Sequence, residues 1–233
     1  AAYRIVFTLN FIPMMFISAI YPVTSKLYLS SRDSLREVVE RSFKYLLITG
    51  LVLVVLLTSF GDYVIFRIFG EEYLPSITCL KILIWAELFV FLNICYDNLF
   101  KSINRQVLAT YMIMIVASLN VILNLILIPQ LSFIGASYAT LAARFFSFIL
   151  FSAIIMKSEY RFSSKVINDV TKIVVLTVAI WIFSTLTGFS NHIIAVIYLL
   201  VFPLVLIYFN VIDDTDRKIA QDIFSSIKSV LRI

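Results

Sequence analysis

The sequence contains few of the residues on which soluble enzymes depend. Its 233 residues include one His, two Cys and five Gly. No grouping of His, Cys and carboxylates has the spacing of a metal site, and the sequence has neither a glycine-rich phosphate loop with a Lys nor a G-x-S-x-G motif. Five glycines also leave no room for a nucleotide-binding fold. We therefore expect no enzyme activity, no cofactor and no metal site.

Charge is scarce as well, and apolar residues take its place. Only 14% of the residues are charged and 61% are hydrophobic, with a mean hydropathy of +1.00. A soluble domain has about 25% charged and about 45–50% apolar residues. The composition predicts an all-α, polytopic membrane protein. Cys79 and Cys95 lie 16 residues apart in one apolar stretch, too far apart on a helix to form a disulfide, so we interpret both as small core residues.

The apolar stretches predict how often the chain crosses the membrane. A helix needs about 20 apolar residues to cross about 30 Å of hydrocarbon. By this measure the sequence predicts seven spans, at 3–25, 43–60, 77–100, 107–128, 134–156, 172–188 and 192–209. We divide the chain into a five-span bundle (1–156), a terminal pair of spans (157–209) and a cytoplasmic amphipathic tail (210–233).

The turn between the fourth and fifth predicted spans is unusual because it carries no charge. Residues 106–143 contain no charged side chain, a stretch too long for one span and suited to two. Pro129 and Gly135 mark the reversal, because Pro cannot donate a backbone hydrogen bond and Gly tolerates the backbone angles that a reversal needs.

Lys and Arg residues collect in alternate loops. Five lie between the first and second spans, two between the third and fourth, four between the fifth and sixth, and four in the tail, which together are 15 of the 19 in the chain. The positive-inside rule places these loops in the cytoplasm. We therefore expect residue 1 on the outer side and a cytoplasmic C-terminus. Because the chain begins without Met or a signal sequence, we interpret it as the last part of a longer protein.

This charge bias also explains the net charge of +5 without a nucleic-acid partner. Cations beside the ends of spans meet anionic lipid headgroups. Two segments next to basic residues, 34–45 and 213–233, have apolar residues at helical spacing and are predicted to be interfacial helices on the inner leaflet. Ser34 and Glu37 have the spacing of a capping box. A partner-binding role for the tail is the alternative.

Polar residues inside the spans are the candidates for function, because a charge at the centre of a span costs about 2.5–3.5 kcal/mol on insertion scales. At about 1.5 Å per residue, Glu87, Arg144 and Asn120 fall at one depth near mid-membrane. Other polar residues share the helix faces of these three: Asp97 with Glu87, Asn124 with Asn120, and Ser137 and Thr140 with Arg144. Arg4 begins a further polar stripe on the first span.

The same pattern has purely structural interpretations. The stripes are compatible with hydrogen bonding between helices, and Glu87 and Arg144 are compatible with a structural ion pair. Arg4 is compatible with a side chain that reaches the outer headgroups.

Three segments resemble one known family in order and spacing. They are AAYRIVFTLNFIPMMFISAIYPVTSK, which ends in a Pro-Xaa-hydroxyl pattern, then FGEEYLPS, and then NLILIPQLSFIGASYAT. Together they span residues 1–140 and are similar to prokaryotic polysaccharide and lipid-linked oligosaccharide flippases of the multidrug/oligosaccharidyl-lipid/polysaccharide flippase superfamily. The third segment has LSFIG where family members often have Tyr-Gly. Residues 157–233 carry no motif of the family.

The resemblance implies a V-shaped transporter of two pseudo-symmetric bundles around a central cavity. Seven spans with residue 1 outside suit the last seven of a 14-helix member, so the first bundle and one helix would precede this chain. The implied activity is the flipping of a lipid-linked oligosaccharide across the cytoplasmic membrane of a prokaryote. Arg4 and Arg144 would bind the phosphate, and four further residues would bind sugar hydroxyls: Asn120, Asn124, Ser137 and Thr140.

Three other function classes remain open on the sequence. A cation-coupled multidrug antiporter of the same superfamily would use a titrating carboxylate, for which Glu87 or Asp97 is the candidate. A lipid-linked sugar polymerase or ligase would need a sizeable outer loop, whereas the longest outer loop here is about 16 residues, at 61–76. A non-transporting membrane scaffold is the last alternative.

Overall fold

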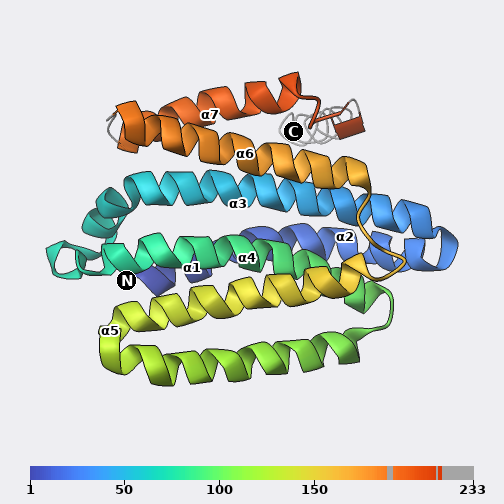
Figure 1. The fold of residues 1–233 in the computed structure, drawn as a ribbon, viewed down its shortest axis with the longest axis horizontal. Coiled ribbons are helices and arrows are strands. Elements are labelled where there is room, and N and C mark those ends of the chain that lie inside the picture. The colour runs from blue at the N-terminus through green and yellow to red at the C-terminus, as the bar shows by residue number, and fades with distance from the viewer. Residues whose placement is uncertain (188–190, 214, 217–233) are drawn as a thin grey trace, which may run out of the picture. The chain divides into compact units, whose positions relative to one another are not determined.

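The computed structural model describes residues 1–187, 191–213 and 215–216, and the regular elements in this part of the chain are all helices. Figure 1 shows their course. The chain divides into two compact units, Ala1–Val170 and Thr171–Ile233. This boundary lies inside helix α6 (Ser164–Thr187). The all-helical architecture agrees with the composition.

Helix α4 (Ser76–Ser102) is the centre of the first unit. It packs against α1 (Ala2–Leu9), α2 (Phe11–Ser30), α3 (Arg32–Phe69) and α5 (Gln106–Met156). The backbones of α3 and α4 approach closely at Gly50, where an added Cβ would lie 2.6 Å from Leu88 Cδ1. Small residues permit such close packing, on which helices in a membrane depend because lipid tails are as apolar as Leu.

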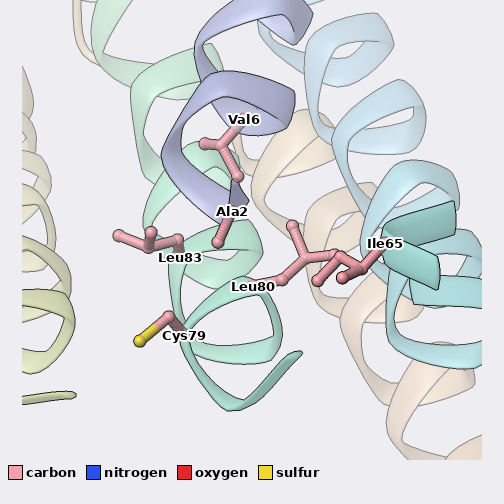
Figure 2. Packing of buried hydrophobic residues seen from close by; sticks show 6 residues of the cluster. All are labelled: Ala2, Val6, Ile65, Cys79, Leu80 and Leu83. Atoms are coloured by element: carbon pink, nitrogen blue, oxygen red, sulfur yellow. The ribbon is translucent and has the colours of Figure 1, made fainter. Parts of the chain in front are cut away.

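An apolar cluster joins α1, α3 and α4 at one end of the first unit (Figure 2). Its buried members are Ala2, Val6, Ile65, Cys79, Leu80 and Leu83. Because Ala2 and Val6 are four positions apart, they lie on one face of α1. The opposite face of α1 is therefore turned away from the bundle.

The first predicted span is interrupted rather than smoothly bent. Helix α1 ends at Leu9, Asn10 is a turn residue, and α2 begins at Phe11. Pro13 accounts for the break, because it has no N–H to donate to the carbonyl of Leu9. Helix α2 then continues through Pro22 to Ser30.

Helix α3 is longer than a membrane span requires. Its 38 residues correspond to about 57 Å at 1.5 Å per residue, against about 30 Å of hydrocarbon. The segment 34–45, which we expected to form a separate interfacial helix, is the beginning of this continuous helix. Its cap is Ser31, whose Oγ accepts from the backbone N of Ser34 at 3.3 Å, and not the predicted capping box.

The apolar residues of this segment pack against protein rather than lipid, which explains the difference. Leu35 and Val39 are 0% and 2% exposed. The segment 157–163, which connects α5 to α6 (Ser164–Thr187), is fastened along α3. The contacts are an Arg32–Glu159 ion pair, hydrogen bonds from Ser163 N and Oγ to the Glu40 carboxylate, and packing of the Phe162 and Phe43 rings.

These contacts define the two ends of the first unit. The basic end holds residues 26–32, 101–105 and 157–163, joined by the Arg32–Glu159 pair and by a Thr24–Ser102 hydrogen bond of 2.8 Å. The far end holds residues 70–75 and 130–133. There Gly70, with a φ of 88°, ends α3, and a short 3-10 helix, η1 (Glu71–Tyr73), leads to α4.

Helix α5 is a hairpin of two arms, which Figure 1 shows folding back on itself. The reversal occurs at Ser132, with a φ of 53° and a ψ of −137°, so the unusual backbone angles belong to a serine and not to Gly135. Gly135 has another role. A Cβ at this position would lie 2.2 Å from the carbonyl O of Leu127, so glycine allows the two arms to meet.

The second unit contains most of α6 together with α7 (Asn191–Tyr208). Thr177 of α6 and Tyr198 of α7 share a buried hydrogen bond of 3.1 Å between their hydroxyl groups. Lys172 Nζ donates to the carbonyl of Phe209 at 3.3 Å. The predicted amphipathic tail helix falls mostly on residues 217–233, outside the described residues.

The helices accommodate all seven predicted spans. Within the described residues, five helical stretches are long and apolar enough to cross a membrane, with α1 and α2 taken together, and α7 is a shorter apolar helix. Since α5 supplies two arms, each predicted span has a helix. The fold is a polytopic helical bundle.

Candidate functional site

The centre of the candidate site is the contact between α4 and the second arm of α5. The two helices run parallel, as three contacts along their length show. The contacts are Cys79 Sγ to Phe133 O at 3.7 Å, the Phe89 and Phe145 rings at 5.1 Å, and Tyr96 OH with Ser152 Oγ at 3.0 Å. Each joins residues 54 or 56 positions apart, so Glu87 lies level with residues 141–143.

Glu87 and Arg144 therefore lie at nearly the same level, but in different surroundings. Glu87 is 4% exposed, and its Oε1 has no hydrogen-bond partner in the described part of the chain. Arg144 is on the exposed side of α5. The two side chains form no ion pair within 4.0 Å. The anticipated pair is thus close but not joined.

Asn93 fastens the two helices beside Arg144. Its Nδ2 donates to the backbone carbonyl of Arg144 at 3.2 Å, while its Oδ1 is buried without a partner. The backbone of Arg144 is therefore held against α4, and its side chain remains uncommitted within the described residues.

The hydroxyl stripe on the second arm of α5 is not a single open surface. Ser137 is 4% exposed, and its Oγ donates to Phe133 O at 3.3 Å. Thr140 is half-buried and donates to Ala136 O at 2.9 Å. Both hydroxyls are thus turned back onto their own helix, and Ser137 faces the bundle interior.

Asn120 and Asn124 form a pair on the first arm of α5. Asn124 Nδ2 donates to the Asn120 backbone carbonyl at 2.8 Å and to Asn120 Oδ1 at 2.9 Å. Both side chains are half-buried. The Asn120 amide NH₂ and the Asn124 Oδ1 make no further hydrogen bond within the described residues, so this pair keeps a donor group and an acceptor oxygen for a ligand.

Arg4 and Asp97 lie away from this level. Arg4 is exposed on α1, on the side opposite the apolar cluster of Figure 2, and no described contact joins it to Arg144. Asp97 is paired with Lys101, Oδ2 to Nζ at 2.6 Å, toward the basic end. Their side chains are 27% and 53% exposed, so solvent or headgroups weaken this pair and its role is local.

A buried polar junction that the sequence did not single out lies where α2 meets α4. Thr24 Oγ1 contacts Ser102 Oγ at 2.8 Å and accepts from Asn98 Nδ2 at 3.4 Å. Thr24, Asn98 and Ser102 are 0%, 3% and 4% exposed. Thr24 is the hydroxyl residue of the Pro-Xaa-hydroxyl pattern, which was the available signal, and the structure gives that pattern a physical purpose.

Residues 1–126, more than half of the chain, match the family model MatE. The chain belongs to the MatE family. The chain is also similar to an uncharacterized membrane protein of Methanocaldococcus jannaschii, with 30% identity over 133 residues, which are 57% of this chain and 26% of that protein. The match thus covers about a quarter of the relative's length. No solved structure matches the chain.

Family membership confirms the resemblance in its coarser form. The chain is a multi-pass membrane protein of the multidrug/oligosaccharidyl-lipid/polysaccharide flippase superfamily, whose MatE members are transporters rather than enzymes. As a membrane protein it contacts lipid. The uncharacterized relative adds the membrane location and no substrate.

Proposed function

We propose that this MatE chain belongs to a transporter that moves a lipid-linked oligosaccharide across the cytoplasmic membrane of a prokaryote. The observation that carries the proposal is the contrast between two charges at one level. Arg144 is exposed and makes no ion pair with any residue that the structure describes, whereas Glu87 is buried. A cation presented in this way suits an anionic ligand.

The chemistry of the ligand follows from the side chain. A lipid-linked sugar of the undecaprenyl- or dolichyl-phosphate type carries phosphate between lipid and glycan. The guanidinium group offers a planar fork of donors that matches phosphate oxygens. The Asn120–Asn124 pair and Thr140 supply further polar groups for sugar hydroxyls, while Ser137 is buried and its hydroxyl bonds its own helix.

Transport requires the rest of the protein. In this proposal the chain is the second bundle with the terminal helix pair, and a first bundle completes the cavity. Rocking of one bundle against the other would expose Arg144 to each side in turn. Arg4 serves the same ligand at the far end, which we place on the outer side, with the basic end in the cytoplasm.

A cation-coupled drug antiporter is the second candidate, and one observation favours it. The Glu87 carboxyl is buried with an unpartnered oxygen, as a coupling carboxylate would be in one of its states. Antiport through Glu87 would require this carboxyl to reach the cavity, whereas Arg144 already lies on the surface of the bundle.

Substitution of Arg144 tests the proposal on the full-length protein in proteoliposomes. Arg144→Lys should retain part of the flipping of a lipid-linked oligosaccharide, because a point charge still attracts phosphate, and Arg144→Gln should abolish it with insertion intact. Arg161→Gln is the matched control, since Arg161 is an exposed arginine at the basic end.

The assay scores access of the glycan from the outer leaflet. If Arg144→Gln flips the lipid-linked oligosaccharide at the wild-type rate, Arg144 does not bind the ligand. Export of cationic dyes by the wild type, lost in Glu87→Gln and unchanged in Arg144→Gln, would assign the protein to the antiporter class.

A further inference from the structure

The Glu87 carboxyl is a buried ionisable group of the first unit. It is 4% exposed, and its Oε1 accepts no hydrogen bond. A buried carboxyl oxygen without a partner is costly in a membrane, so a state in which this oxygen gains a hydrogen-bond donor would be stabilised. The proposed binding of phosphate by Arg144 does not use it.

Arg144 is the cation that lies near enough to donate a hydrogen bond to the Glu87 carboxyl. The contacts along α4 and α5 set Glu87 level with residues 141–143, one turn or less from Arg144. Helical side chains lean toward the N-terminus of their helix. Because α4 and α5 run parallel, Glu87 and Arg144 lean the same way, and the offset of one turn or less, at most about 5 Å, is one that the long Arg144 side chain can span.

The backbone of Arg144 is held in place by a hydrogen bond, whereas its guanidinium is not. Asn93 Nδ2 holds the Arg144 carbonyl at 3.2 Å. The guanidinium makes no ion pair within the described residues, and Arg144 is exposed. On the α4 side two buried acceptors stand without partners, Glu87 Oε1 and Asn93 Oδ1. These two acceptors are six residues apart on α4, about 9 Å along the helix axis, so Glu87 Oε1 is the one that lies near the level of Arg144.

We propose that Glu87 is the internal counter-ion of Arg144, which takes up the guanidinium when no phosphate is bound and yields it when a phosphate arrives. The inference rests on the proposed function and assigns Glu87 a role in it. Glu87 is a positioning residue, because it acts on the ligand only through Arg144. The ligand phosphate and the Glu87 carboxylate compete for the Arg144 guanidinium. The protein therefore binds phosphate more weakly than Arg144 would bind it without Glu87.

The effect of Glu87 on phosphate affinity depends on the fraction of time for which its carboxylate binds the guanidinium. If Glu87 holds the guanidinium for about nine-tenths of the time, the apparent dissociation constant is about tenfold higher than the intrinsic one. Removing the competitor should restore the intrinsic affinity and delay release. Net flipping should then slow, while exchange of bound for free ligand on one side continues.

Binding of farnesyl pyrophosphate, a short isoprenoid pyrophosphate, to the full-length protein in detergent tests the inference by calorimetric titration. Glu87→Gln should lower Kd by about tenfold, Arg144→Gln should abolish binding, and the double variant should behave as Arg144→Gln. Glu72→Gln, an exposed glutamate in η1, is the matched control and should leave Kd unchanged.

The outcomes separate this inference from the function on which it rests. Wild-type binding that is lost in Arg144→Gln, with Kd unchanged or raised in Glu87→Gln, overturns the counter-ion role alone. If the wild-type protein does not bind the pyrophosphate, both the proposed phosphate site at Arg144 and the proposed competition by Glu87 are wrong. A lower Kd in Glu87→Gln that persists in the Arg144→Gln background also overturns it, because Glu87 would then act without Arg144.

Discussion

At the scale of single residues, polar side chains in this bundle are satisfied in two ways. Thr8, Thr140 and Ser137 donate to carbonyls four positions earlier in their own helices, which places a hydroxyl among apolar neighbours without tying helices together. Thr24 also contacts Ser102 and Asn98 across the α2–α4 interface. Only the second kind contributes to the packing of one helix on another.

This difference predicts unequal effects of the same substitution at two threonines. Thr24→Val removes the acceptor of the Asn98 amide and the partner of Ser102, so it should lower the free energy of unfolding by about 1–2 kcal/mol. Thr8→Val is the matched control and should change it little, because Thr8 is exposed and bonds only its own helix.

Thermal unfolding of the full-length protein in detergent measures both variants. Thr24→Ser keeps the hydroxyl and should recover most of the loss. Equal unfolding temperatures for Thr24→Val and Thr8→Val would show that the junction does not stabilise the α2–α4 contact.

At the scale of elements, the α5 hairpin depends on one close backbone contact. The two arms meet at Gly135, where an added Cβ would lie 2.2 Å from Leu127 O. At Gly61 of α3 the nearest atom to an added Cβ is Leu80 Cδ2 at 2.9 Å. A backbone carbonyl cannot move aside as the end of a leucine side chain can, so the two glycines differ in their tolerance of a methyl group.

Gly135→Ala should therefore destabilise the protein by about 1–3 kcal/mol, the usual cost of overpacking, and displace the second arm of α5 with Arg144. Gly61→Ala gains the same helix propensity and should cost less. Unfolding in detergent compares the two, and a loss in Gly61→Ala as large as in Gly135→Ala would contradict the hairpin contact.

At the scale of the whole molecule, the alternation of basic loops predicts which end of the first unit faces the cytoplasm. Ser132, at the far end, and Arg161, at the basic end, are both exposed, and the native Cys79 and Cys95 are buried. In intact cells an impermeant thiol reagent should label Ser132→Cys, and it should label Arg161→Cys only after permeabilisation.

The two variants serve as controls for each other because each tests one end of the same unit. Labelling of Arg161→Cys in intact cells, with Ser132→Cys protected, would reverse the proposed orientation. The basic end would then face outward, and the end that holds residues 70–75 and 130–133 would face the cytoplasm.

Much of the fold could be predicted from the sequence, because a helix that crosses a membrane must have about 20 apolar residues in a row. Long apolar stretches predict the spans, and each predicted span lies in a helix. Pro129 and Gly135 marked the α5 reversal, although the positive φ falls on Ser132. The segment 34–45 was misjudged as an interfacial helix because its apolar face, with Leu35 and Val39, suits lipid and protein equally.

The candidate site was accessible to the sequence only in part. The rise of a helix set Glu87 and Arg144 near one depth, since depth follows from counting residues. The rotation of α4 and α5 against each other decides the rest. It determines that Glu87 is buried and Arg144 exposed, that Asn93 donates to the Arg144 carbonyl, and that Ser137 is buried. That rotation is decided by packing between segments some 50 residues apart, and no local pattern records it.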